Sequence, residues 1–212
     1  MRTKSNSRHQ DSHDPQGFNE RTFHAKNAHK LDDPDRLVWL PPGDVIASLR
    51  LADGMAVADI GAGTGYFAIP MARAIGKGRV AAVDFQPDML SRIREKLQHS
   101  GEELPIDLAK GDAEATGLDQ ASMDVVLIAN VWHELDHHAE VLSEVRRIIR
   151  NEGRLAILDW RTDVTQQQGP PLDHRISVDT VTRVLKEHRW MPAPPTTIGR
   201  YHYLIQASPA RS

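Results

Sequence analysis

The sequence predicts an α/β protein built on a doubly wound, mostly parallel sheet. Short apolar runs rich in Val and Ile alternate with segments of helical periodicity, which is the pattern of a parallel sheet with crossover helices. A glycine-rich turn follows the first of these runs, at the place where open α/β sheets bind their ligands. The chain of 212 residues, 40% of them hydrophobic, can bury one core.

The elements follow from these patterns in chain order. Residues 31–51 predict a first helix that is broken at Pro41-Pro42. The apolar runs expected to form parallel strands are residues 55–60, 78–84, 105–112, 123–131 and 153–160. The helices expected between and after them are residues 64–76, 86–101, 137–153 and 177–190.

Caps and a turn mark three of the predicted boundaries. Gly101 is expected to end the second of these helices as a C-cap, and Ser177 to begin the last one as an N-cap. Residues 196–207 predict a hairpin that turns at Gly199-Arg200. The chain therefore closes with antiparallel pairing.

The two ends of the chain differ in character. Residues 1–30 are polar, with too few large apolar side chains to offset the entropy of ordering them, and we expect a flexible N-terminal arm. The arm contains four irregularly spaced histidines, His9, His13, His24 and His29. That spacing favours a solvated arm over a metal site. Residues 31–212 are expected to form a single domain.

Composition excludes several classes of function. The formal net charge of −3, from 26 basic and 29 acidic residues, provides no broad cationic face for nucleic acid. The absence of cysteine excludes disulfides, thiolate zinc sites and cysteine nucleophiles, and the reducing cytoplasm is the simplest location. No apolar run approaches the roughly 18 residues of a membrane span.

The turn after the first strand and an acid after the second indicate a nucleoside ligand. The turn contains Gly61, Gly63 and Gly65, which let the backbone approach a ligand above the strand ends. About twenty residues further on, Asp84 ends the next strand, where a carboxylate accepts hydrogen bonds from both hydroxyls of a ribose. Tyr66 stands where the dinucleotide pattern requires its third glycine, which argues against NAD.

These motifs resemble those of the class I S-adenosylmethionine-dependent methyltransferases. The likeness begins with VADIGAGTGYF and AVDFQPDML, continues through GDAEATGL and DVVLIANVWHEL, and ends with EVRRIIRNEGRLAILDW. It implies a Rossmann-like sheet of about seven strands with an antiparallel last strand. Within the family, the sequence is most similar to the small-molecule branch, of the quinone-biosynthesis type.

The resemblance also implies a set of cofactor-binding residues for S-adenosyl-L-methionine. The methionine part would lie over Asp59, the glycine turn and the backbone near Asn130, and Asp84 would hold the ribose. Phe85 would pack against the adenine, and Asp112 with Ala113 would contact its edge. The predicted cofactor-binding residues are Asp59, Gly61, Gly63, Gly65, Asp84, Phe85, Asp112, Ala113 and Asn130.

One stretch, NVWHELDHH, matches the H-E-x-x-H pattern of zinc peptidases from His133 to His137. That chemistry requires both histidines on one continuous helix, whereas His133 is expected just past a buried strand. We therefore expect no metal, and instead a loop where the acceptor meets the methyl group. His133 and Glu134 are the predicted catalytic residues, as base or as acceptor-orienting group; the alternative for His133 is a bond to a neighbouring loop carbonyl.

The predicted function is S-adenosylmethionine-dependent methyl transfer to a small molecule by in-line displacement. Amino methylation of DNA is disfavoured, because residues 130–133 lack the Pro-Pro pair typical of those enzymes. The alternatives are a non-catalytic sensor or scaffold that binds the cofactor, a nicotinamide oxidoreductase and a zinc hydrolase. Arg161, His174 and Arg175 are candidates for the acceptor side. The acceptor, its methylated atom and the oligomeric state are left open.

Overall fold

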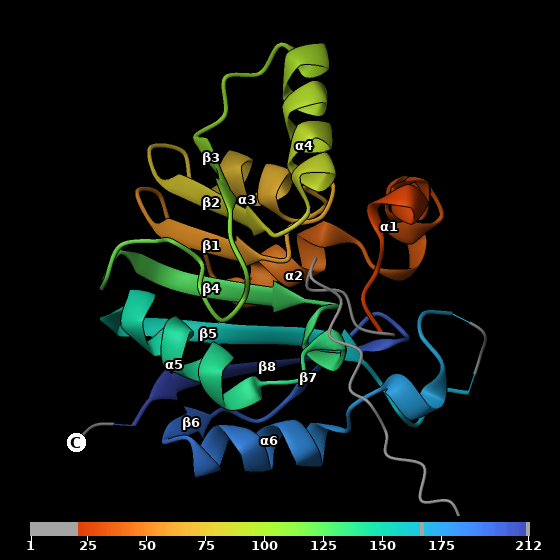
Figure 1. Cartoon of the computed structure of the whole chain (residues 1–212), viewed down its shortest axis with the longest axis vertical. Helices are drawn as coiled ribbons and strands as arrows, with labels where there is room; N and C mark the ends of the chain where they lie inside the picture. Colours follow the sequence, from red (N-terminus) through yellow and green to blue (C-terminus); the bar gives the residue numbers. More distant parts are fainter. Residues whose placement is uncertain (1–20, 166–167, 211–212) are drawn as a thin grey trace, which may run out of the picture.

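A computed structural model describes residues 21–165 and 168–210 as one α/β domain (Figure 1). Most of the predicted arm, including His9 and His13, lies outside the described residues. The strands are β1 (Ala56–Ile60), β2 (Arg79–Asp84), β3 (Ile106–Lys110), β4 (Met123–Ala129), β5 (Ile149–Trp160), β6 (Trp190–Pro192), β7 (Thr196–Ile198) and β8 (His202–Pro209). The helices are η1 (Ala25–Asp32), α1 (Arg36–Trp39), α2 (Pro42–Leu49), α3 (Ala68–Ala74), α4 (Pro87–Ser100), η2 (Trp132–Glu134), α5 (His138–Ile148), η3 (Leu172–His174) and α6 (Val178–Glu187).

The sheet has the predicted class and topology. Its strand order is β3-β2-β1-β4-β5-β8-β6, with β7 paired to β8. The first five strands are parallel, and β8 runs antiparallel to β5. The order reverses between β1 and β4, so the ends of these neighbouring strands form the crevice where doubly wound sheets bind ligands.

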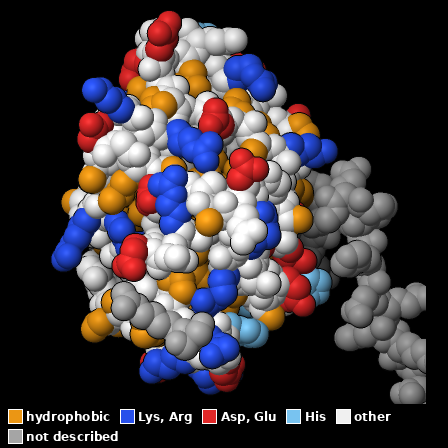
Figure 2. Space-filling model, turned by 90° about the vertical axis from the view of Figure 1, so that its left-hand side faces the viewer, with side chains coloured by type: hydrophobic (Ala, Val, Ile, Leu, Met, Phe, Trp, Pro, Cys, Tyr) orange, Lys and Arg blue, Asp and Glu red, His pale blue; other side chains and the backbone are white. Residues whose placement is uncertain are grey.

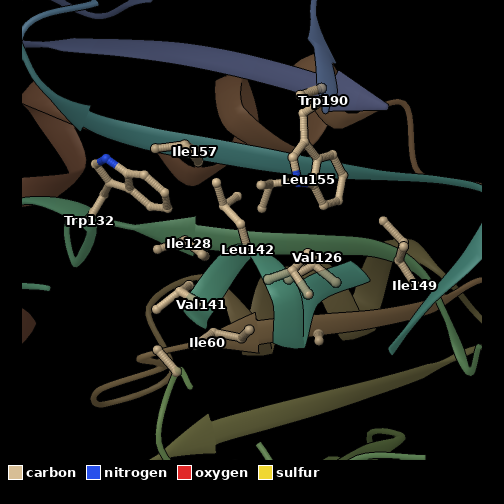
Figure 3. Packing of buried hydrophobic residues seen from close by; sticks show 14 of the residues in the cluster. Ile60, Val126, Ile128, Trp132, Val141, Leu142, Ile149, Leu155, Ile157 and Trp190 are labelled. Carbon is tan, nitrogen blue, oxygen red and sulfur yellow. The ribbon is translucent and has the colours of Figure 1, made fainter. Parts of the chain in front are cut away.

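The core consists of two buried clusters, one on each face of the sheet. On one face, Val141 and Leu142 of α5 pack against β4 and β5, beside Trp132 (Figure 3). On the other face, α2 and α3 cover residues of β1 and β4, including Val57 and Leu127. Because the central strands are buried on both faces, they are apolar apart from Asp59 in β1 and Asp124 in β4.

Most predicted boundaries agree with the structure. The first helix is interrupted before Pro42, and Gly101 ends α4 in the left-handed region. Ser177 caps α6, its Oγ accepting from the N–H of Thr180 at 3.2 Å. The predicted hairpin is the pair β7 and β8. The predicted division at residue 30 falls inside η1, and whether the residues before it form a separate arm stays a prediction.

Two boundary predictions were wrong. α3 begins at Ala68 rather than at residue 64, because the glycine turn continues through that stretch. β5 begins at Ile149, directly after α5, because Ile149 pairs with Met123 of β4. The sheet agrees with the expected seven or so strands and antiparallel end: within the described residues it contains eight, because the short β6 pairs with β8 beside β5. None of these shifts moves a strand end that faces the crevice.

The surface carries charges of both signs. On the face shown in Figure 2, Lys and Arg side chains are interspersed with Asp and Glu rather than separated by sign. Within the described ranges, no helix combines the length and the apolar character that a membrane span needs.

Candidate active site at the strand ends

The glycine turn lies at the end of β1 and is shaped by contacts that only glycine permits. Gly61 has φ +72°, and a Cβ placed on it would lie 2.4 Å from Cγ2 of Val131 in the loop after β4. The N–H groups of Gly61 and Ala62 donate to the carbonyl of Val83 at 2.8 and 3.0 Å. The turn is therefore held close to both neighbouring strands.

Asp84 connects the turn to the end of β2. Its Oδ2 accepts from the N–H of Gly63 at 2.9 Å, and its Oδ1 accepts from the N–H of Gln86 at 2.9 Å. Burial raises the pKa of Asp84, and these two hydrogen bonds oppose that rise. Each carboxylate oxygen keeps a lone pair beyond the bond it already accepts, so Asp84 can accept from ribose hydroxyls.

The residues predicted to contact the adenine lie near Asp84 along the same edge. Phe85 follows Asp84 directly and is half-buried. Asp112 is exposed beyond β3 and lies close enough for its charge to raise the pKa of Asp84. Ala113 is buried, and residues 112 and 115 form an isolated bridge that fixes this loop.

Two buried oxygens at the ends of β1 and β4 have no hydrogen-bond partner among the described residues. They are Oδ2 of Asp59 and Oδ1 of Asn130. Burial, followed by the charge of Asp84, raises the pKa of Asp59 to about 7. Asn130 has φ +58°, a conformation that strand-end residues rarely adopt. Because a buried acceptor without a donor is unfavourable, both oxygens fit a cationic amino group such as that of S-adenosylmethionine.

His133 is bound by a carboxylate rather than by a loop carbonyl. Oδ1 of Asp159 lies 2.8 Å from Nδ1 of His133, and Oδ2 accepts from the backbone N–H of His133 at 2.9 Å. Burial alone would lower the pKa of His133, but the charge and hydrogen bond of Asp159 and the charge of Glu134 outweigh it, so the pKa is raised. Asp159 thus fixes both the position and the tautomer of the ring.

Glu134 lies on the other side of the imidazole. Its Oε1 is 4.0 Å from Nε2 of His133, and its Oε2 accepts from the N–H of Phe23 at 2.9 Å. Burial raises the pKa of Glu134 to about 7. A buried imidazole and a buried carboxyl group, each with a raised pKa, therefore lie beside the crevice, an arrangement typical of active sites.

The H-E-x-x-H spacing does not place its two histidines on one helix. His133 lies in η2, and α5 begins only at His138. The imidazole of His137 is exposed and pairs with Glu114, with Nδ1 and Oε1 2.9 Å apart. Within the part of the chain that the structure describes, no group of three or more His, Cys, Asp or Glu side chains could hold a metal ion.

An aromatic group lies where β5 and β8 meet the N-terminal segment. Trp160 pairs with His202 across the two strands, with ring centroids 4.2 Å apart, and Trp39 of α1 stacks parallel to His202 at 5.8 Å. Both ring nitrogens of His202 are buried without a hydrogen-bond partner among the described residues. Burial lowers the pKa of His202 to about 3, so this ring is neutral.

The candidates for the acceptor side are engaged in local contacts. Arg161 forms an ion pair with Asp163, in which the closest atoms are 2.7 Å apart. Arg175 is buried and donates to four backbone carbonyls, those of Arg161, Val164, Gln168 and Pro170. His174 ends η3 and is half-buried. Arg175 therefore stabilises the loop after β5, and four of its five N–H donors are already used.

Sequence reasoning missed Asp159 and Gln86. Asp159 comes one residue before the end of β5, so the signal that found Asp84, an acid at a strand end, applied to it as well. Gln86 gave no such signal. Its side chain binds the backbone of residues 23 and 25, a pairing with a part of the chain that composition assigned to the arm.

Known proteins share this fold and these motifs. The family described as a methyltransferase domain matches residues 58–157. An uncharacterized methyltransferase of Mycobacterium bovis is 30% identical over 181 residues, covering 79% of this chain and 61% of that protein. A ubiquinone/menaquinone biosynthesis C-methyltransferase of Laribacter hongkongensis is 32% identical over 116 residues, covering 54% of this chain and 47% of that protein.

A solved structure of a methyltransferase is also similar to this chain. The crystal structure of a SAM-dependent methyltransferase from Aquifex aeolicus has a TM-score of 0.82 and 28% identity, and the match covers 88% of this chain and 98% of that one. Fold and site together define a doubly wound α/β protein with a glycine turn after β1 and a buried acid at the end of β2. The comparisons confirm the resemblance to the class I S-adenosylmethionine-dependent methyltransferases: residues 58–157 match a methyltransferase domain, and the cofactor of this family is S-adenosylmethionine. The chain spans less than two thirds of the length of these two curated relatives.

Proposed function

We propose that the protein transfers the methyl group of S-adenosylmethionine to a small-molecule acceptor by in-line displacement. The observation that carries this proposal is the contact between Asp159 and His133, which fixes an imidazole beside Glu134 at the same sheet edge as Asp59 and Asp84. When bound, S-adenosylmethionine supplies an electrophilic methyl group on a sulfonium. Such a displacement depends mainly on holding the acceptor close and aligned in a dry site.

The cofactor would be held by the residues predicted from the sequence. The unpartnered oxygens of Asp59 and Asn130 would accept from its amino group, and Asp84 would accept from the ribose hydroxyls. Gly61, Gly63 and Gly65 have no side chains, so the cofactor would lie close to the backbone of the turn. Phe85, Asp112 and Ala113 would contact the adenine.

His133 would act on the proton of the acceptor. Because Asp159 accepts from Nδ1–H, Nε2 of the neutral ring carries the free lone pair. Nε2 lies 4.0 Å from Oε1 of Glu134, so an acceptor hydroxyl or acidic C–H that contacts both groups from one side could give its proton to Nε2. Glu134 would orient the acceptor and stabilise the imidazolium that forms.

The surroundings favour a small acceptor with a planar part. Trp39, Trp160 and His202 form an aromatic group where β5 meets β8, next to Asp159, and rings at this position would pack against a planar acceptor. The relatives named for ubiquinone and menaquinone biosynthesis support an acceptor of this kind.

Calorimetric titration with S-adenosylmethionine and S-adenosylhomocysteine tests the cofactor site. We expect saturable binding to the unmodified protein and a dissociation constant about 10- to 100-fold higher for Asp84→Asn, which loses charge-assisted hydrogen bonds to the ribose. Asp107→Asn, which changes an exposed carboxylate on β3, is the matched control and should bind as the unmodified protein does. An unmodified protein that binds neither compound would overturn the proposal.

Label transfer tests the acceptor class. The protein is incubated with methyl-tritiated S-adenosylmethionine and cell extract, and the extract is then separated into small molecules and macromolecules. Label in a small molecule other than S-adenosylmethionine, lost in His133→Ala, supports the proposal. Label confined to nucleic acid or protein contradicts it, and binding without any transfer would indicate a non-catalytic cofactor-binding protein.

A further inference from the structure

Gln86 binds the backbone of the N-terminal segment as a neighbouring strand would. Its Oε1 accepts from the N–H of Ala25 at 2.8 Å, and its Nε2 donates to the carbonyl of Phe23 at 2.8 Å. The side chain is 7% exposed. The primary amide supplies a donor and an acceptor side by side, whereas an ionised Glu has no donor and a Met has no N–H or O–H group, so neither could replace both bonds.

The same peptide stretch also reaches the catalytic loop. The N–H of Phe23 donates to Oε2 of Glu134 at 2.9 Å, while the carbonyl of Phe23 is held by Gln86. Gln86 follows β2 and Glu134 follows β4, and β1 lies between these two strands in the sheet. Residues 23–25 therefore pass across the end of β1, above the glycine turn.

Further contacts hold the rest of this segment, residues 21–32, which we call the strap. Arg21 forms an ion pair with Asp136 at one end. At the other end, Oδ1 of Asp32 accepts from the hydroxyl of Thr64 at 2.6 Å and pairs with Lys96 at 2.5 Å. The strap lies beside the ends to which the central strands point (Figure 1).

The strap lies directly over the proposed cofactor site. A Cβ placed on Gly63 would be 3.2 Å from Cδ1 of Leu31, so this strap side chain faces the glycine turn. Gln86 also donates its backbone N–H to Asp84, the proposed ribose ligand, at 2.9 Å. One chain of hydrogen bonds thus links Gly63, Asp84, Gln86, Phe23 and Glu134.

We propose that Gln86 is a positioning residue that latches the strap across the cofactor site and, through the N–H of Phe23, fixes the carboxyl group of Glu134. This inference rests on the proposed function, because it assigns the strap a role in retaining the cofactor. Release of the cofactor requires the strap to open, and opening breaks both bonds of Gln86. Gln86 therefore sets how long the cofactor stays bound and whether Glu134 is held ready for the acceptor.

Two variants remove the latch from opposite sides. Gln86→Glu keeps the shape of the side chain but replaces the donor that Phe23 requires by an oxygen. Ala25→Pro removes the backbone N–H that donates a hydrogen bond to Oε1 of Gln86. It suits the local backbone, since Ala25 is the first residue of η1 and His24 before it is extended, at φ −81° and ψ 141°. Gln98→Glu, an exposed change of the same type on α4, is the matched control.

The first measurement is tryptic cleavage of the full chain after Lys26 and Lys30, both exposed on the strap, followed by mass spectrometry. We expect Gln86→Glu and Ala25→Pro to be cut about three- to tenfold faster than the unmodified protein, the effect of losing one neutral hydrogen bond. Gln98→Glu should be cut at the unmodified rate. Equal cleavage of Gln86→Glu and Gln98→Glu would overturn the latch.

The second measurement is the dissociation rate of S-adenosylhomocysteine, followed by stopped-flow tryptophan fluorescence. We expect both latch variants to release it about three- to tenfold faster, with the Tm of each variant within a few degrees of the unmodified protein. Faster cleavage with an unchanged release rate would overturn the role in retaining the cofactor. If the unmodified protein does not bind S-adenosylhomocysteine, the proposed function fails, and the cleavage assay alone still decides whether Gln86 holds the strap.

Discussion

Asp159 binds His133 through both carboxylate oxygens, one on the ring nitrogen Nδ1 and one on the backbone N–H, at 2.8 and 2.9 Å. The contact joins the end of β5 to the loop after β4. It fixes the ring relative to the sheet edge that carries Asp59 and Asp84. With its backbone and its ring nitrogen both bound to Asp159, His133 loses little further freedom when an acceptor arrives.

Replacement of Asp159 by Asn should therefore impair transfer but not cofactor binding. The amide cannot stabilise the imidazolium, and its NH₂ group can force the wrong tautomer on His133. We expect the rate of label transfer to fall about 100-fold or more, the usual contribution of a general base. The dissociation constant for S-adenosylhomocysteine should stay unchanged, as it should for Asp163→Asn, an exposed control in the following loop.

The pKa of the His133 ring should also change in Asp159→Asn, and it can be measured without an acceptor. The anionic partner favours the protonated imidazole, so its removal should lower the pKa of His133. A nitrogen NMR titration of the histidine rings measures this directly. A His133 midpoint that is equal in Asp159→Asn and in the unmodified protein would show that the contact has no electrostatic role.

Glu134→Gln should shift the pH dependence of transfer. Transfer requires neutral His133, so its rate should rise with pH through the pKa of that ring. An ionised Glu134 raises the pKa of His133, and Gln removes this effect, so the midpoint should move to lower pH. Rates over a pH series test this, with Glu140→Gln on the exposed face of α5 as the control. A midpoint that moves upward would contradict the arrangement.

Asp59 should make the protein less stable as the pH rises. Burial raises its pKa in the folded state to about 7, from an ordinary value of 3.8, so the folded protein binds the proton more tightly than the unfolded chain. Stability is then highest below the unfolded pKa and falls as pH rises through the folded one. The expected loss is on the order of a few kcal/mol.

Asp59→Asn should remove this penalty while weakening the cofactor site. Thermal unfolding without cofactor should show a gain in Tm of several degrees at about pH 8 and little gain at about pH 4. The same variant should bind S-adenosylmethionine more weakly, because the carboxylate for the amino group is lost. A gain of equal size at both pH values would mean that ionisation of Asp59 is not the cause.

The parallel sheet could be predicted because its signals are local. Apolar runs, helical periodicity, the glycine turn and the caps at Gly101 and Ser177 each depend on neighbouring residues only. The start of β5 could not be predicted from the sequence. Ile149 continues the apolar stripe of α5 and becomes a strand residue only by pairing with Met123. Tertiary pairing overrides local pattern at that boundary.

The candidate site also contains residues that could be predicted from the sequence and residues that could not. Asp59 and Asp84 could be found because each occupies a strand end fixed by the order of the motifs. The partner of His133 lies 26 residues away on another strand, and the partners of Gln86 lie more than 60 residues away in the strap. The strap binds largely through backbone groups, which every residue carries, so its polar composition gave no sign of the contact.

Arg175 gives a last prediction, about the loop after β5. Its guanidinium donates to four carbonyls between residues 161 and 170, which a lysine ammonium with three donors on one atom cannot span. Arg175→Lys should lower the free energy of unfolding by about 1–3 kcal/mol. Hydrogen exchange should speed up across residues 161–165 and 168–175, while Arg183→Lys, an exposed change on α6, should alter neither. Unchanged exchange with loss of label transfer would instead assign Arg175 to the acceptor, because its donors would then be free to bind it.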